Sequence, residues 1–449
     1  MNEVIDMKIS FHGGAREVTG ACYLLESGDT KILIDCGLFQ GSRECEDLNF
    51  EPFRFVPAEL DAVVITHAHL DHIGRLPRLI REGFTGPIYS TAPTRELAQV
   101  ILEDALRLSQ RNHQELYSAA DLAQTLKAWH DLPYRTVKKV GGFAIRLSDA
   151  GHILGSAMVE CWAEDKHLLF SGDLGNVPSV LLPSPEAPRD IEYLVIESAY
   201  GNRAHEAPAE RVSLLERAVE DAAARGGTLL IPAFATERTQ DILHLLNEML
   251  LFKRIPEMPV FVDSPLATRI TETYERYPGY YRDEIHALFR AHPNLFRFKK
   301  LRFTETTEQS KAINGVPQPK IIIAGSGMMQ GGRILHHLPR YLPDRNSILL
   351  IVGFQAAGSL GRRLVEGEKR VKISGEEVSV EAEIRNIGGF SAHADNPQLY
   401  EFVVRNRDSL KRVFVVQGEE DQSLHFTQEI RDRLGIPADA PTLYQPFDI

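Results

Sequence analysis

Residues 61–72 read DAVVITHAHLDH, an apolar run followed at once by three histidines and an aspartate. The apolar run predicts a buried β-strand, and the residues after it predict the start of a helix. Histidines at alternate positions leaving a strand, His67 and His69, can point into one pocket, and the next pair, Asp71 and His72, can reach an adjacent metal. Imidazole and carboxylate groups suit zinc or manganese. The stretch therefore predicts a metal site on a rigid support rather than a polar turn with chance histidines.

Three further polar residues lie at the ends of predicted strands. His152 lies in DAGHILGS, Asp173 in LLFSGDLG and Asp35 in TKILIDCG. Taken alone, each is more often a structural or turn residue, but beside the 67–72 segment His152 becomes a candidate third ligand and Asp173 a bridging ligand. Asp35 either orients a ligand histidine or the reacting water, or ends its strand in a turn. Two ions about 3.5 to 4 Å apart that share a carboxylate favour hydrolysis, with hydroxide as the nucleophile.

The chain is expected to fold as more than one domain, because 449 residues exceed the size at which one core stops growing. Short strands and glycine-rich turns dominate the beginning and the end. The middle alternates helices with apolar strands such as GTLLIPAF and PKIIIAGSG, which predicts a parallel sheet covered by helices. We therefore expect an α/β protein in which residues 204–385 are inserted between the two parts of a first domain, residues 1–203 and 386–449.

The composition of the chain predicts where in the cell it is found and how it could bind a polyanion. The chain has no apolar run long enough to span a membrane and no apolar leader, so a cytoplasmic protein is expected. Its four cysteines are scattered and are expected to be reduced. Lys plus Arg number 50 against 62 Asp plus Glu, a net charge of −12, so binding a polyanion such as RNA would need a local cationic groove.

The segments ILIDCG, HAHLDH, AGHILGS and FSGDLG, in this order, resemble the four sequential motifs of the metallo-β-lactamase superfamily. VIESAYG, GFSAHAD and VVQGEE resemble the three additional motifs of its β-CASP nucleases, and FHGGAREVTGACY, IPAFATERTQ, VDSPLA, SGMMQGGR and GFQAAGSLGRR resemble bacterial and archaeal members. The resemblance covers nearly the whole chain. It implies an αββα sandwich with an inserted β-CASP domain, and a ribonuclease that binds single-stranded RNA between the two domains.

The resemblance also assigns roles to particular residues. It implies two divalent ions, zinc or alternatively manganese. The first ion would be held by His67, His69, His152 and Asp173, and the second by Asp71, His72 and Asp173. Asp35, Asp71, Glu197 and His393 would be the catalytic residues, with Glu197 orienting His393 so that it can assist at the scissile phosphate or the leaving oxygen.

The sequence departs from the family pattern at Gln417, where members acting on RNA usually have a histidine ligand. A glutamine amide is a weaker ligand for zinc, so the second position should hold its ion less tightly. His425, or an acidic residue at positions 419–421, could compensate by folding back; Gln417 itself or water is the simpler candidate.

Substrate contacts are expected from the glycine-rich turns of the insert, whose backbone N–H groups can cradle phosphates, although such turns are also common packing devices. The candidate substrate-binding residues are Ser326, Gly327, Arg333, Arg362 and Ser391. The basic run FRFKKLRF at 296–303 could stack bases, or could be a half-buried edge strand.

Three functions fit these observations. The first is a metal-dependent endo- or exoribonuclease. The second is an RNA-binding or scaffold protein whose catalysis has weakened after the change at Gln417. The third is a metallohydrolase of a small ester or phosphodiester, which the acidic net charge would suit. A homodimer is also expected from the family.

Overall fold

The structure is a computed structural model that describes residues 7–205, 208–353, 355 and 358–449. The chain forms two compact units, the first made of Met1–Ala204 and His393–Ile449 and the second of His205–Ala392. The domain boundaries expected from the sequence, after residues 203 and 385, remain predictions. Residues 356–357 of the QAAGSLGRR segment lie outside the described part of the chain.

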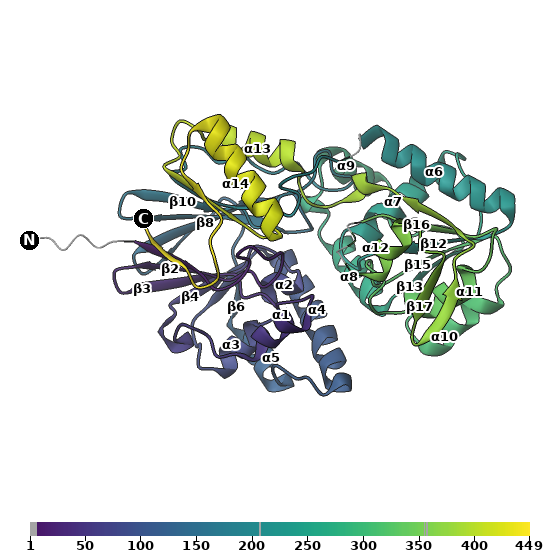
Figure 1. Ribbon diagram of the computed structural model, residues 1–449, viewed down its shortest axis with the longest axis horizontal. Helices are drawn as coiled ribbons and strands as arrows, with labels where there is room; N and C mark the ends of the chain where they lie inside the picture. The colour runs from purple at the N-terminus through teal and green to yellow at the C-terminus, as the bar shows by residue number, and fades with distance from the viewer. Residues whose placement is uncertain (1–6, 206–207, 354, 356–357) are drawn as a thin grey trace, which may run out of the picture. The chain divides into compact units, whose positions relative to one another are not determined.

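The first unit contains two seven-stranded sheets (Figure 1). The first sheet runs in the order β22 (Pro446–Asp448), β1 (Lys8–Phe11), β2 (Tyr23–Ser27), β3 (Thr30–Ile34), β4 (Ala62–Val64), β5 (Ile88–Ser90) and β6 (Trp129–Asp131). The second runs β21 (Ala438–Asp439), β20 (Arg412–Val416), β11 (Tyr193–Glu197), β10 (Lys166–Phe170), β9 (Ala157–Ala163), β8 (Phe143–Asp149) and β7 (Val137–Val140). Each sheet is partly antiparallel; β3, β4 and β5 pair in parallel in the first sheet, and β10, β11 and β20 pair in parallel in the second.

A continuous apolar core joins the two sheets. It contains Phe11, Ile34 and Val64 from the first sheet and Ile145 and Phe170 from the second, all essentially buried. Side chains alternate across a strand, so one face of each strand supplies this core. Burying one such side chain contributes about 1.5 to 3 kcal/mol, so the layer between the sheets stabilises the unit substantially.

Helices cover the outer faces of both sheets (Figure 1). The first sheet carries α1 (Arg43–Asp47), α2 (Leu70–Ile73), α3 (Leu76–Arg81), α4 (Ala92–Asn112) and α5 (Ala119–Ala128). The second carries α13 (Asn396–Val404) and α14 (Glu420–Leu434), whose residues Phe402 and Phe426 pack with Leu169 and Val413 of the strands. Helix, sheet, sheet and helix form the αββα sandwich, and this prediction is confirmed.

The second unit is built on a six-stranded sheet in which every pair is parallel. Its order is β14 (Leu301–Phe303), β13 (Val260–Asp263), β15 (Lys320–Ala324), β12 (Thr228–Pro232), β16 (Ile348–Ile351) and β19 (Glu383–Asn386). The other elements of this unit are α6 (Pro208–Arg225), α7 (Arg238–Leu251), α8 (Pro265–Arg276), α9 (Asp283–Ala291), α10 (Thr307–Ala312), α11 (Ile334–Tyr341), α12 (Leu360–Val365) and the hairpin β17 (Arg370–Ile373) and β18 (Glu376–Ser379).

Both faces of this parallel sheet are buried, as continuous apolar strands require. Leu230 of β12 joins a core cluster with Leu338 of α11 and Leu364 of α12. Its neighbours Leu229 and Ile231 are also buried but lie outside that cluster, because they point to the other face. The predicted insert with a parallel, helix-covered sheet is confirmed.

Five short 3₁₀ turns are found among the described residues, at Leu48–Phe50, Pro57–Glu59, Pro278–Tyr280, Ile313–Gly315 and Gly388–Phe390. No helix in the described part of the chain is both long and apolar enough to cross a membrane.

Candidate metal centre

The candidate site residues of the first unit follow strands whose ends lie together. Asp35 follows β3, the 67–72 segment follows β4, and His152, Asp173 and Gln417 follow β8, β10 and β20. Glu197 is the last residue of β11. The carboxyl ends of neighbouring parallel strands meet at one edge of a sheet, so side chains far apart in sequence converge there.

Four of these residues form a cluster with the spacing of a metal site: His67, His69, His152 and Asp173 each offer one ligand atom, and these atoms lie within 4.8 Å of one another. His69 Nδ1 lies 3.1 Å from His67 Nε2 and 3.2 Å from His152 Nε2. Asp173 Oδ2 lies 3.3 Å from His67 Nε2 and 3.5 Å from His152 Nε2. Ligands about 2.0 to 2.1 Å from a tetrahedral zinc ion would be about 3.3 Å apart. The donor set therefore fits a four-coordinate divalent ion.

The protonation of these histidines supports the same assignment. Burial, and then the charge of His67, lower the pKa of His69 well below its usual value. Burial and His393 do the same for His152. Neutral imidazoles, whose lone pairs converge beside a carboxylate, are the form in which histidine binds a metal.

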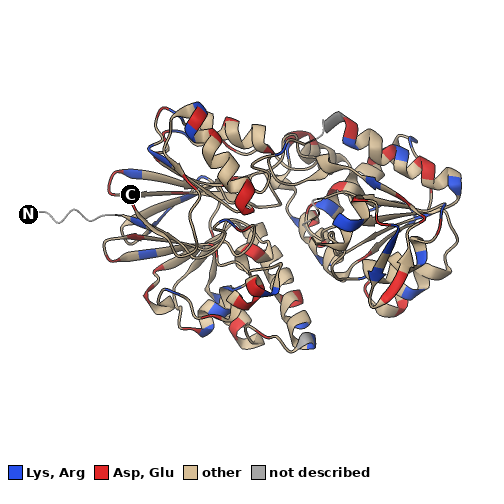
Figure 2. Cartoon of the chain, viewed as in Figure 1, with Lys and Arg blue, Asp and Glu red and all other residues tan. Residues whose placement is uncertain are grey.

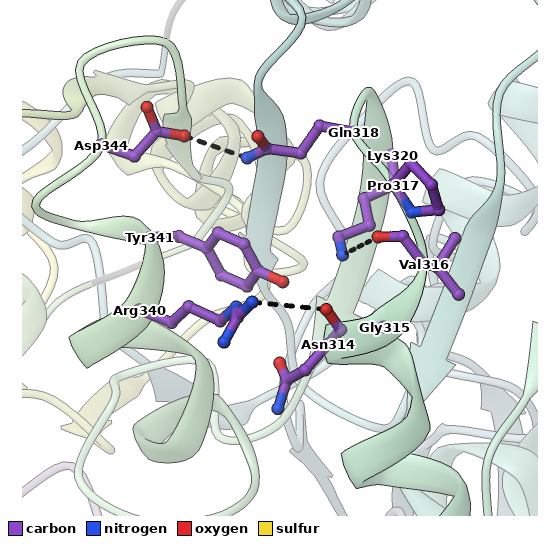
Figure 3. A pocket seen from close by; sticks show the side chains of 9 residues that line it. All are labelled: Asn314, Gly315, Val316, Pro317, Gln318, Lys320, Arg340, Tyr341 and Asp344. Carbon is purple, nitrogen blue, oxygen red and sulfur yellow. Dashed lines mark hydrogen bonds between the residues drawn. The ribbon is translucent and has the colours of Figure 1, made fainter.

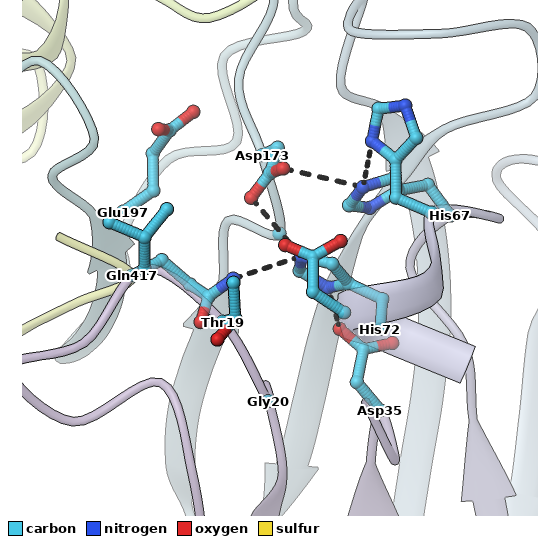
Figure 4. Close-up of polar contacts among 12 residues, drawn as sticks. Thr19, Gly20, Asp35, His67, His72, Asp173, Glu197 and Gln417 are labelled. Atoms are coloured by element: carbon cyan, nitrogen blue, oxygen red, sulfur yellow. Dashed lines mark hydrogen bonds and ion pairs between the residues drawn. The ribbon is translucent and has the colours of Figure 1, made fainter. Parts of the chain in front are cut away.

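A second group of polar residues lies on the other side of Asp173 (Figure 4). Asp173 Oδ1 is 3.4 Å from Nε2 of His72 and, although buried, has no hydrogen-bond partner among the described residues. Asp71 Oδ2 lies 3.9 Å from the same nitrogen of His72. One oxygen of Asp173 thus faces each group, which is the geometry of a bridging carboxylate.

Asp35 orients His72. Its Oδ2 lies 2.7 Å from Nδ1 of His72, which leaves Nε2 directed toward Asp173. Thr66 holds this carboxylate with two donors, its backbone N–H and its hydroxyl, each at 2.8 Å. Burial opposes a charge on His72, but the carboxylates of Asp173 and Asp35 outweigh it and raise the pKa of His72 well above its usual value. The negative charges of these two carboxylates therefore favour a positive charge beside Nε2 of His72.

Thr66 was not identified from the sequence. It lies directly before His67, where the apolar strand pattern treats it as one more strand residue. The available signal was a hydroxyl residue directly before the histidine motif, at the end of the apolar run.

Gln417 lies at the second group. Its side-chain nitrogen is 3.0 Å from His72 Nε2, and its Oε1 is buried without a hydrogen-bond partner in the described part of the chain. His425, the candidate substitute ligand, is exposed on α14, and Glu420 instead pairs with Arg16 at 3.0 Å. Glu419 caps α14 and Asp421 is exposed, so Gln417 is the candidate that lies at this position.

His393 and Glu197 form a pair beside Asp173. His393 Nδ1 lies 3.0 Å from Oε2 of Glu197 and 3.9 Å from Oδ2 of Asp173. The backbone N–H of Leu174 donates to Glu197 Oε1 at 2.6 Å, and Gly175 pairs with His393 in a β-bridge. Burial lowers the pKa of His393, but the two carboxylates outweigh burial and raise it to about 9. An imidazolium next to the metal ligands can donate a proton or a hydrogen bond to an anionic substrate.

The candidate substrate residues belong to the second unit, and their role stays a prediction. Ser326 closes its own turn, because its backbone N–H donates to Gly331 O at 3.1 Å, and Gly327 follows in the same turn. Arg362, on α12, donates to Glu366 at 2.7 Å and is partly exposed. Ser391, which is buried, follows the 3₁₀ turn at Gly388–Phe390.

Arg333 makes its hydrogen bonds within the second unit. Its guanidinium donates to Asp263 Oδ1 at 2.7 Å and to the carbonyl oxygens of Thr304 and Glu305. Of the two readings of the basic run at 296–303, the structure favours the edge strand, because β14 ends the sheet order and Lys299 and Lys300 approach Glu257.

The fold and this donor set define a protein of the metallo-β-lactamase class with an inserted second domain. Three family models match the chain: the Metallo-beta-lactamase superfamily at residues 15–233, the Beta-Casp domain at 239–364 and the Zn-dependent metallo-hydrolase RNA specificity domain at 377–441. The chain belongs to the β-CASP family of the metallo-β-lactamase superfamily, and the resemblance stated from the motifs is confirmed. Divalent metal ions are the cofactors that this superfamily implies.

Curated relatives cover nearly all of the chain. It is 41% identical over 418 residues to "Ribonuclease TTHA0252" of Thermus thermophilus, covering 93% of this chain and 94% of the relative. It is 32% identical to "Transcription termination factor FttA" of Methanosarcina mazei, covering 97% and 70%. A solved structure described as a protein of unknown function from Enterococcus faecalis shares the fold, with a TM-score of 0.54, 12% identity and coverage of 99% and 100%.

Proposed function

We propose that this protein is a metal-dependent ribonuclease that hydrolyses phosphodiester bonds of single-stranded RNA. The observation that carries the proposal is the arrangement around Asp173, one oxygen of which faces His67 and His152 while the other faces His72. The similarity to a named ribonuclease over most of both chains supports RNA as the substrate. The RNA specificity domain model at 377–441 supports it as well.

The chain's residues have distinct parts in this reaction. His67, His69, His152 and Asp173 would hold one divalent ion, and Asp71, His72, Asp173 and Gln417 the other, with zinc the proposed metal. Such ions, when bound, supply an activated water and stabilise charge on the phosphate. Asp35 keeps Nε2 of His72 directed inward, and Glu197 keeps the Nδ1 proton of His393 directed toward itself. His393, which lies beside Asp173, would act as an imidazolium that donates a proton or a hydrogen bond to the phosphate or the leaving oxygen.

RNA must be bound by local contacts rather than by a general attraction. The net charge is −12, and Figure 2 shows Lys and Arg interspersed with Asp and Glu over the helices of both units. Binding through phosphate contacts weakens steeply with salt. We expect cleavage of RNA in the cytoplasm; the homodimer expected from the family stays a prediction.

The test is cleavage of a labelled single-stranded RNA by the purified, metal-analysed protein and by two variants. The His69→Ala variant should lose metal and activity together. The His393→Ala variant should keep its metal content and lose on the order of 100-fold or more in kcat, because it removes only a proton donor.

An exposed histidine outside the site, changed in His425→Ala, is the matched control and should cleave like the wild type. Full metal content in the wild type without RNA cleavage would contradict the proposal. Activity toward a small ester or phosphodiester under the same conditions would then favour the small-substrate alternative.

A further inference from the structure

A pocket of about 440 Å³ lies in the second unit (Figure 3). Its walls include Val316, Gln318, Lys320, Arg340, Tyr341 and Asp344, and we call it the Tyr341 pocket. It lies where β15 begins, at Lys320, and where α11 ends, at Tyr341. The turn at 325–333 follows the opposite end of β15, so the two features are separate.

Two cationic side chains line the Tyr341 pocket. The Lys320 ammonium donates to Ile313 O at 2.9 Å and to Val316 O at 2.6 Å, and its third N–H is not used in these bonds. Arg340 donates to Asn314 O at 3.3 Å through one of its five N–H groups. Burial, and then the charge of Arg340, lower the pKa of Lys320 to about 8, which is the direction expected when a second cation lies near a buried ammonium.

The hydroxyl of Tyr341 is a third polar group at this place. Tyr341 is only 4% exposed, and its hydroxyl is buried without a hydrogen-bond partner among the described residues. Leaving such a buried group unpaired is unfavourable. In Figure 3 the hydroxyl is directed between Arg340 and the segment that Lys320 holds. The Tyr341 ring centroid lies 5.4 Å from Lys320 Nζ and 6.0 Å from Arg340 Cζ, so both cations lie beside this side chain.

The one carboxylate of the pocket is already engaged. Asp344 Oδ2 accepts from Gln318 Nε2 at 2.9 Å and from Ser347 Oγ at 2.6 Å, and Oδ1 accepts from the backbone N–H of Asn346 at 3.0 Å. Its charge is therefore met by neutral donors, while the charges of Lys320 and Arg340 remain without an acidic partner in the pocket.

We propose that the Tyr341 pocket binds a small phosphate monoester, such as a nucleoside monophosphate. A phosphate has three strong acceptor oxygens, which match the ammonium, the guanidinium and the phenol. The volume falls within the roughly 300 to 1,000 Å³ of small-molecule sites and exceeds what a bare phosphate fills. The ring of Tyr341 and the side chains of Val316 and Pro317 give the organic part an apolar wall. The proposal uses no residue of the metal centre and stands whether or not the chain cleaves RNA.

The test is calorimetric titration of the intact, metal-loaded protein with adenosine 5′-monophosphate, inorganic phosphate and adenosine. We expect one binding event for the monophosphate that persists in His69→Ala and weakens at least tenfold in Arg340→Gln and in Tyr341→Phe. Arg345→Gln is the matched control and should bind like the wild type, because this side chain is 83% exposed and pairs with Glu381 outside the pocket. Inorganic phosphate should bind at least tenfold more weakly than the monophosphate, and adenosine should not bind.

Thermal unfolding separates this binding role from a structural one. Because Tyr341→Phe removes an unpaired buried hydroxyl, it should weaken binding without lowering the unfolding midpoint. Unchanged binding in Arg340→Gln, or loss of all binding in His69→Ala, would overturn the proposal. Equal affinity for phosphate and the monophosphate would refute the organic part of the assignment, and equal affinity for adenosine would refute the phosphate part.

Discussion

The side-chain nitrogen of Gln417 lies 3.0 Å from Nε2 of His72, on the opposite side of the imidazole from Asp35. Half a turn of the amide about its last bond would bring the oxygen to the same point. A neutral amide oxygen is a weaker ligand for zinc than an imidazole. The ion position shared by Asp71, His72 and Asp173 should therefore bind its metal more weakly than the position of His67, His69 and His152.

Replacing this ligand should strengthen the weaker position. We expect Gln417→His to lower the dissociation constant of the second ion on the order of tenfold or more, because it supplies an imidazole beside His72. The backbone φ of 48° at Gln417 is one that histidine tolerates better than most residues. Metal content per chain after dialysis against a graded chelator series measures the effect.

The matched control for this change is Gln417→Leu, which keeps the bulk and removes the donor. It should retain one ion per chain and lose the second at lower chelator concentration than the wild type. Identical release curves for the wild type and both variants would show that position 417 does not touch the metal.

Removing the metal should destabilise the first unit. An ion that binds only the folded state at 100 times its dissociation constant adds about 2.7 kcal/mol. The ligands come from both sheets, since His67 follows β4 and Asp173 follows β10, so the ion joins them. We expect a chelator to lower the unfolding midpoint of the wild type by several degrees and that of His69→Ala by much less. An equal shift in both proteins would contradict this.

Asp263 should make the second unit sensitive to acid. Burial opposes its charge, but hydrogen bonds from His337, Ser310, Thr304 and Arg333 outweigh burial and hold the pKa of its carboxyl well below the usual range. A carboxylate with a depressed pKa contributes stability above about pH 4, its value in the unfolded chain, and that contribution is lost as the pH falls.

The corresponding variant is Asp263→Asn. It should cost about 2 to 4 kcal/mol of unfolding free energy at pH 7, because it leaves buried donors and Arg333 without their charged partner. Urea unfolding at pH 7, 4 and 3 should show the difference from the wild type shrinking below pH 4. A difference that stays constant with pH would mean that the charge of Asp263 is not what stabilises the network.

Gly14 should be required for the position of Gln417. It has a φ of 62°, and a Cβ there would lie 2.2 Å from Oε1 of Gln417. Gly14→Ala should therefore lower stability by about 1 to 3 kcal/mol and reduce occupancy of the second ion. Gly226→Ala is the control for backbone strain alone, because its φ is 67° and no atom lies within 4 Å of the added Cβ. Equal loss of metal from both variants would show that the clash with Gln417 does not cause the loss.

Much of the fold was predictable because its strands are marked by apolar runs that end in polar residues. DAVVIT before His67 and LLF before Asp173 both form strands, β4 and β10, and both end at the site. The αββα arrangement and the roles of separate motifs came from the family resemblance, since strand patterns alone do not say which strands are neighbours.

The contacts that the sequence did not predict are those between buried polar groups. Arg333 is a cation on a glycine-rich turn, and nothing local shows that it binds Asp263 instead of facing solvent. The hydrogen bond from Thr66 to Asp35 and the approach of Tyr341 to Lys320 join residues on different elements. Hydrophobic periodicity indicates which face is buried, and it carries no information on which polar side chains meet within the fold.

The second unit is inserted within the first, so the residues of the metal centre are synthesised in two separate stages. The ribosome releases His67, Asp173 and Glu197 before the inserted residues 205–392, and His393 and Gln417 only after them. Until β20 emerges, β11 remains an open edge of its sheet, and Glu197 has no histidine beside it. An unfinished chain therefore holds the ligands of the first ion position, but the site lacks His393 and Gln417 until the inserted residues have been synthesised.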